Sequence, residues 1–136
     1  MKKLILSIFL GIVAACPVLT VTAAPPIGFG QVIDNLDGQK NTKLHVEEYW
    51  KSIKGQEVTW SGDVTDVDGS SSKAKLYLAD KSRPLYDGYN IIVTTSDVAK
   101  ASNIKKGQRV RFKGILDDYN SKKPGAVIKL KEAQIL

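Results

Sequence analysis

Five aspartates lie in or directly after two segments that alternate apolar and polar residues. They are Asp63, Asp66, Asp68, Asp117 and Asp118. If the two segments pair, these carboxylates could meet around a hard cation such as calcium and assist hydrolysis. Their spacing matches no dedicated metal loop, and aspartates also form turns. We therefore expect no metal and no cofactor, and a metal-assisted hydrolase remains an alternative.

Other catalytic chemistry has little support in the sequence. Nucleophilic catalysis needs a base beside a Ser, Thr or Cys, and His45 is the only histidine. It falls in a predicted helix, where a surface or packing role is more common. Residues 28–30 (GFG) lack the preceding strand and following helix that make a glycine-rich loop a phosphate site. These features predict that the chain is not an enzyme.

Lysines and tyrosines lie near one another in three regions of the sequence. Basic side chains with an aromatic ring between them suit single-stranded nucleic acid, since lysine pairs with phosphate and the ring stacks on a base. The residues of this kind are Lys73, Lys75, Tyr77, Tyr89, Tyr119, Lys122 and Lys123. A second basic row consists of Arg109, Arg111, Lys113, Lys129 and Lys131. Outward lysines also keep any soluble strand from aggregating, so both rows have a purely structural interpretation.

The elements that position these residues are one helix and five strands. Thr42 fits a helix N-cap and Gly55 a helix end, which predicts a helix over residues 42–53 with Leu44 and Ile53 on its buried stripe. Strands are predicted at residues 57–67, 73–79, 89–95, 109–118 and 126–135, with a short helix at 97–102. An antiparallel sheet in the order βββ-α-ββ can close on itself, which leaves no unpaired edge.

An internal repeat supports a barrel. Residues 54–62 (KGQEVTWSG) recur 52 positions later as residues 106–114 (KGQRVRFKG). Each copy has a turn, an inward aromatic residue (Trp60 or Phe112) and a glycine in mid-strand (Gly62 or Gly114). A mid-strand glycine usually marks a bulge or bend, and the strands of a small barrel need such bends. We therefore predict that Trp60 and Phe112 are buried inside the barrel.

The segments KGQEVTWSGDVTDV, KKGQRVRFKGILDDY and GAVIKLKEAQI resemble the first, fourth and fifth strands of bacterial OB-fold proteins. The similar groups are the tRNA-anticodon-binding-like OB family and small periplasmic OB-fold proteins, and the resemblance covers about residues 46–136. It implies a five-stranded OB barrel over residues 42–136. It also implies a binding fold whose ligands range over nucleic acids, oligosaccharides and proteins, held across strands two and three and the flanking loops. The resemblance would place the lysines and tyrosines named above on this surface, so they are the predicted ligand-binding residues.

The N-terminus has the pattern of an export signal. Two lysines precede residues 4–24, which contain no charge, and small residues end this stretch. Cleavage after Ala23 is expected, with acylation at Cys16 or an uncleaved anchor as alternatives. Without the signal, the protein has 18 Lys+Arg against 14 Asp+Glu, a net charge of about +4, and no cysteine for a disulfide. Residues 24–41 are rich in Gly and Pro and are predicted to form a flexible leader with one short structured piece.

The sequence thus predicts a periplasmic or secreted binding module with no stable membrane span. Its ligand is expected on the strand 2–3 face, with single-stranded nucleic acid or another anionic ligand as the first candidate. An envelope protein or a glycan is an alternative partner, in which case the chain would be the protein-interaction subunit of a cell-envelope complex.

Overall fold

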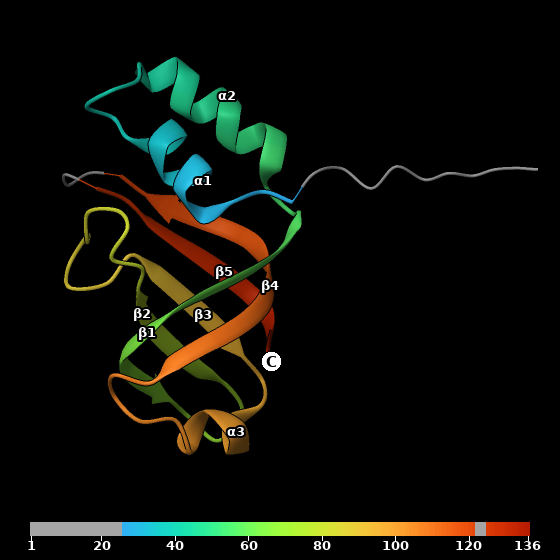
Figure 1. The fold of residues 1–136 in the computed structure, drawn as a ribbon. Helices are drawn as coiled ribbons and strands as arrows, with labels where there is room; N and C mark the ends of the chain where they lie inside the picture. The colour runs from blue at the N-terminus through green and yellow to red at the C-terminus, as the bar shows by residue number, and fades with distance from the viewer. Residues whose placement is uncertain (1–25, 122–124) are drawn as a thin grey trace, which may run out of the picture.

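Five strands close into a barrel in the computed structural model, which describes residues 26–121 and 125–136. The strands are β1 (Glu57–Gly69), β2 (Ala74–Ala79), β3 (Ile91–Thr95), β4 (Arg109–Asn120) and β5 (Val127–Ile135). Their order around the barrel is β1-β2-β3-β5-β4 (Figure 1). This is the predicted OB-fold barrel, which the structure confirms.

One pairing differs from the antiparallel sheet that the sequence predicted. β3 and β5 run parallel over the three pairs from Ile91–Ile128 to Val93–Leu130, while the other four pairings are antiparallel. The physical reason is the connection between them. After β3 the chain crosses one end of the barrel through α3 (Val98–Ser102) and returns along β4, so that β5 points in the same direction as β3.

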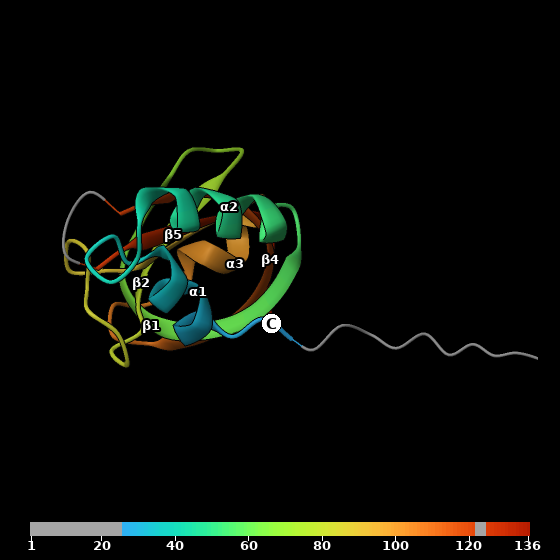
Figure 2. The ribbon, with the colours of Figure 1, turned by 90° about the horizontal axis from the view of Figure 1, so that it is seen from above.

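Helices cover both ends of the barrel. α1 (Phe29–Leu36) and α2 (Lys43–Ile53) lie together over one end, and α3 lies at the other (Figures 1 and 2). Both ends of a small barrel expose core side chains, so these helices complete the burial of a single core.

Residues 24–41 were predicted to form a flexible leader with one short structured piece; α1 is that piece, and it packs into the core, which a flexible leader would not do. Phe29, Val32, Ile33 and Leu36 are buried and belong to the same core as the barrel strands. Their spacing is the i, i+3, i+4, i+7 pattern of one helix face. The glycines and prolines around them obscured that pattern in the sequence.

Helix α2 begins where the sequence predicted, because Thr42 Oγ1 accepts a hydrogen bond of 3.2 Å from the backbone N–H of His45. The sequence predicted that Leu44 lies on the buried side of this helix, which is wrong, because Leu44 is 67% exposed. The buried stripe consists of Val46, Trp50 and Ile53. These residues have the same helical spacing and include an indole, which buries more apolar area than a leucine.

The internal repeat forms a pseudo-two-fold pair of turns. Gly55 and Gly107 have φ angles of 89° and 87°, a left-handed conformation that favours glycine. The N–H of Gly55 donates to the carbonyl of Leu116 (2.9 Å), and the N–H of Gly107 donates to the equivalent carbonyl of Val64 (2.7 Å). Each turn is therefore held by the strand of the other copy.

The mid-strand glycines allow neighbouring strands to approach closely. A Cβ on Gly62 would lie 3.2 Å from the Leu78 Cβ, and one on Gly114 would lie 3.2 Å from the Ala133 Cβ. The β4–β5 register shifts at Gly114, as predicted, whereas the shift in β1 falls at Thr65. Glycine therefore serves close packing in both copies and coincides with a bulge in one.

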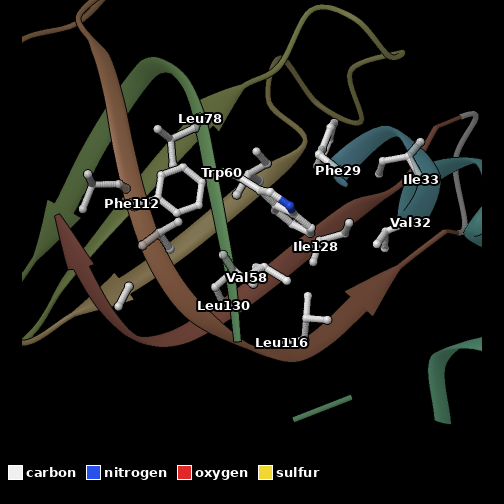
Figure 3. Close-up of a cluster of buried hydrophobic side chains, with 14 of the residues drawn as sticks. Phe29, Val32, Ile33, Val58, Trp60, Leu78, Phe112, Leu116, Ile128 and Leu130 are labelled. Carbon is white, nitrogen blue, oxygen red and sulfur yellow. The ribbon is translucent and has the colours of Figure 1, made fainter. Parts of the chain in front are cut away.

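The predicted aromatic core residues are buried. The two equivalent residues of the repeat, Trp60 and Phe112, sit opposite each other in the β1–β4 register and are 7% and 0% exposed. Trp60 meets Phe29 of α1 edge-on, with ring centroids 5.3 Å apart (Figure 3). Its Nε1–H donates to the carbonyl of Ile27 at 2.8 Å. Trp60 thus joins the barrel to the helical cap, which consists of α1 and α2 together.

Candidate ligand-binding face

The outward side chains of β2, β3 and β5 form one continuous surface. Tyr77 lies opposite Ile92, which lies opposite Lys129, and Lys75 lies opposite Thr94. With Tyr89, Asp117 and Leu130, these residues line a pocket of about 420 Å³. We call this surface the aromatic face; it consists of Lys75, Tyr77, Tyr89, Ile92, Thr94 and Lys129.

Two tyrosines form the centre of the aromatic face. The rings of Tyr77 and Tyr89 pack edge to face, with centroids 5.0 Å apart and an interplanar angle of 62°. Tyr77 comes from β2, whereas Tyr89 precedes β3 and belongs to the loop rather than to the predicted third strand. Burial, and then the charge of Asp87, raises the pKa of Tyr89, so its hydroxyl stays protonated and can donate a hydrogen bond. The pair offers ring surface on which a planar group could stack.

A buried asparagine holds the loop that carries Tyr89. Asn90 is fully buried, and its side chain exchanges two hydrogen bonds of 2.8 Å with the backbone of Asp80, at the far end of the loop. Its own backbone N–H donates to Leu78, and its carbonyl accepts from Ile128. The amide therefore closes the loop and satisfies polar groups that water cannot reach.

Helix α1 holds the same loop through an ion pair. The Arg83 guanidinium donates two hydrogen bonds, of 2.8 and 2.9 Å, to the two carboxylate oxygens of Asp34. Gly30 makes room for this arginine, because a Cβ there would lie 2.7 Å from Arg83 Nη2. The hydrogen bonds from Arg83 hold the pKa of Asp34 below its usual value. The helical cap and the loop are thus connected on the surface.

This pair predicts a dependence of stability on pH. Because the pKa of Asp34 is lower in the folded protein than in the unfolded chain, its contribution is present above the unfolded pKa and is lost as the pH falls through the folded one. We expect Asp34→Asn to lower the melting temperature at neutral pH and to differ less from the wild type in strong acid. Glu47→Gln, at an exposed pair with Lys43, is the control and should show little effect at either pH. An Asp34→Asn difference that stays constant with pH would contradict this assignment.

The aspartates considered as metal ligands lie far apart on the sheet. The register places Asp66 beside Tyr77 on β2 and Asp118 beside Lys129 on β5. β1 and β4 are neighbours in the closed barrel, but their register pairs Glu57 with Ile115 and Asp63 with Arg109. Asp66 therefore lies beyond one end of the paired region, and Asp118 lies beyond the other. The prediction that these carboxylates could meet is therefore wrong. Within residues 26–121 and 125–136, no group of three or more His, Cys, Asp or Glu side chains could hold a metal ion.

The other predicted ligand residues are only partly brought together. Lys73 lies beside the aromatic face and lines an adjacent groove with Thr94 and Lys131. Tyr119 lies elsewhere, because it packs on Trp50 of α2 with centroids 4.9 Å apart, and burial raises its pKa. Lys122 and Lys123 lie outside the described residues.

Lys129 joins the aromatic face although the sequence placed it in the second basic row. The reason is the parallel pairing of β3 with β5, which sets Lys129 beside Ile92. No local pattern signals this pairing. His45, the only histidine, lies on the exposed side of α2, and its Nε2 is 3.0 Å from Asn35 Oδ1 of α1.

No known protein family matches the chain, and no curated protein matches its sequence. The chain is similar to several solved structures. One is a candidate nucleic acid-binding lipoprotein from Klebsiella pneumoniae, with a TM-score of 0.47 and 12% identity over 65% of this chain and 76% of that one. Another is the OBody AM3L15 bound to hen egg-white lysozyme, with a TM-score of 0.41 and 21% identity over 62% and 80% of the two chains.

The chain is also similar to an aspartyl-tRNA synthetase from Entamoeba histolytica, with a TM-score of 0.47 and 12% identity. The similarity covers 90% of this chain and 28% of the synthetase. Among the described residues, no helix has the length and apolar character needed to span a bilayer.

Proposed function

We propose that this chain is an exported binding module without catalytic activity, and that it holds single-stranded nucleic acid, or another anionic ligand with planar rings, on the aromatic face. The observation that carries the proposal is the Tyr77–Tyr89 pair, which lines one pocket with Lys75 and Lys129 on the outside of the barrel. Rings stack on bases whatever their identity, and the flanking ammonium groups pair with phosphates. This arrangement favours a ligand in an extended, unpaired form.

The charges around the face predict a moderate affinity. Lys75 lies across from Asp68 on β1, and Lys129 lies across from Asp118 on β4. Asp117 lines the pocket itself. These carboxylates oppose phosphates and reduce the net attraction of the two lysines. Binding should therefore depend on stacking as well as on charge, and micromolar dissociation constants at low salt are the expected range.

The experiment is a fluorescence-anisotropy titration of a labelled, mixed-sequence single-stranded oligonucleotide, repeated over a salt series. We expect binding that weakens linearly with the logarithm of salt, with a slope of about −1.4 for the two lysines of the face. Tyr77→Ala should raise Kd about tenfold, since each base stacked on an aromatic ring contributes about 1–3 kcal/mol. Lys75→Ala should lower the slope.

One control tests whether the aromatic ring itself is needed, and a second tests whether a lysine away from the face matters as much as one on it. Tyr77→Phe keeps the ring and should bind nearly as well as the wild type. Lys54→Ala, on the turn after α2, removes one charge away from the face and should leave the affinity nearly unchanged. Absence of binding at low salt, or equal losses in Lys54→Ala and Lys75→Ala, would rule out a nucleic-acid site on this face.

A further inference from the structure

The outside of β4 carries a row of cations next to the aromatic face. Arg109, Arg111 and Lys113 alternate with the inward residues of the strand and point away from the core. Their neighbours on β1 are Asp63, Ser61 and Thr59, in that order. Only the first of these carries a charge, so most of the row faces neutral hydroxyl groups.

The cations of this row differ in how far they are neutralised. Arg109 donates to Asp63 at 3.3 Å, and on the adjacent strand Lys131 lies 3.8 Å from Asp117. Among the described residues, Arg111 and Lys113 lie within ion-pair distance of no carboxylate. Two neighbouring cations without a partner leave a local positive potential that an anion would relieve.

The row continues into the aromatic face through β5. Lys129 belongs to the face, and Lys131 follows it on the same outward side of β5. The register then places Lys131 opposite Ile115 and Gln134 opposite Lys113, so the outward row of β4 begins directly beside the outward row of β5. We call the surface formed by Lys131, Lys113 and Arg111 the basic track.

We propose that the backbone of a single-stranded nucleic acid, after stacking on the aromatic face, crosses β5 and continues along the basic track, where Lys113 and Arg111 bind its phosphates. The inference rests on the proposed function of the aromatic face and extends it to a longer footprint. The track contains no aromatic side chain, so it binds charge and not bases. Its contribution should therefore depend on the length of the ligand and on salt, and not on the sequence of the bases.

The test compares two labelled oligothymidylates of about 6 and about 15 nucleotides, which fall within the footprints of single OB barrels. Anisotropy titrations over a salt series use the mature protein and the double variant Arg111→Gln/Lys113→Gln. We expect the double variant to bind the short oligonucleotide like the wild type. The double variant should bind the long oligonucleotide several-fold more weakly than the wild type does. The salt slope of that binding should also be smaller in magnitude than the wild-type slope by about 1.4, the value for two lost phosphate contacts.

A matched control removes the same charge elsewhere. Lys43→Gln/Lys51→Gln lies on α2, where these side chains are 90% and 72% exposed, and should leave both oligonucleotides bound as by the wild type. Thermal melting of both double variants confirms that they fold. Tyr77→Ala should weaken both lengths, because it acts on the aromatic face.

The possible failures can be told apart. If wild-type protein binds both lengths but the track variant keeps its affinity and salt slope for the long one, the track is overturned and the aromatic face stands. An equal loss in the α2 control would mean that only net charge acts, which also overturns the track. If wild-type protein binds neither length, the proposed function fails together with the extension.

Discussion

Trp60→Ala is expected to lower the free energy of unfolding by about 3–5 kcal/mol, the usual range for removing a buried aromatic side chain. Trp60 is 7% exposed, stacks edge-on with Phe29, and donates a hydrogen bond of 2.8 Å to the carbonyl of Ile27. Its loss would leave a cavity where the barrel meets α1 and would leave that carbonyl without its indole partner. Urea denaturation followed by circular dichroism measures the change.

Two further substitutions separate the parts of this effect. Trp60→Phe keeps an aromatic ring and loses the hydrogen bond, so it should cost less than Trp60→Ala by at least about 1 kcal/mol. Leu44→Ala removes an apolar side chain from a residue that is 67% exposed and should change stability by less than about 0.5 kcal/mol. A near-neutral Trp60→Ala would contradict the strand register and the docking of α1.

Asn90→Leu is expected to cost about 3 kcal/mol, although leucine has a similar volume. The substitution removes both hydrogen bonds between the Asn90 side chain and the backbone of Asp80, and each buried polar group left without a partner costs about 1–3 kcal/mol. Because this amide closes the loop that ends at Tyr89, the variant should also lose affinity for the ligand. Urea denaturation and the anisotropy titration measure the two effects.

The control is an asparagine in an exposed position. Asn103 follows α3, and its side-chain amide donates to the carbonyl of Ala99 at the surface, where water can replace it. Asn103→Leu should therefore change stability little and leave ligand binding intact. If Asn90→Leu were as stable as Asn103→Leu, the buried amide would not be what closes the loop.

Much of the fold could be predicted from local patterns. Alternation of apolar and polar residues gave the positions of all five strands, and the repeat indicated two equivalent turns, which the structure shows at Gly55 and Gly107 with nearly equal φ angles. The Thr42 cap defined the start of α2. The alternation and the cap depend on residues close together in the chain, and the repeat compares two segments that are each local.

The features that the sequence missed depend on long-range packing. The pairing of β3 with β5 brings Lys129 to the aromatic face. The two strands lie about 40 residues apart in the sequence, and the local pattern of one strand does not indicate which other strand it pairs with. Tyr119 was predicted to bind the ligand because the loop after the fourth strand flanks the ligand surface of OB folds. Its ring packs on Trp50 of α2, a contact that depends on how the helical cap sits on the barrel.

Part of the candidate site follows from alternation along one strand. Lys75 and Tyr77 share the outward side of β2, as predicted, and Tyr89 contacts Tyr77 although it lies in the loop. The support beneath them, from Asn90 and from the Asp34–Arg83 pair, could not be predicted. It joins residues of the loop to each other and to α1, a helix that the sequence did not reveal.

Amide chemical-shift mapping by NMR tests the placement of the ligand most directly. The isotope-labelled protein is titrated with a short single-stranded oligonucleotide at low salt. We predict that the largest shifts fall on Lys75, Tyr77, Tyr89, Ile92 and Lys129, with little change in α2. Shifts concentrated on α2 or α3, or no shifts at millimolar ligand, would contradict a nucleic-acid site on the aromatic face.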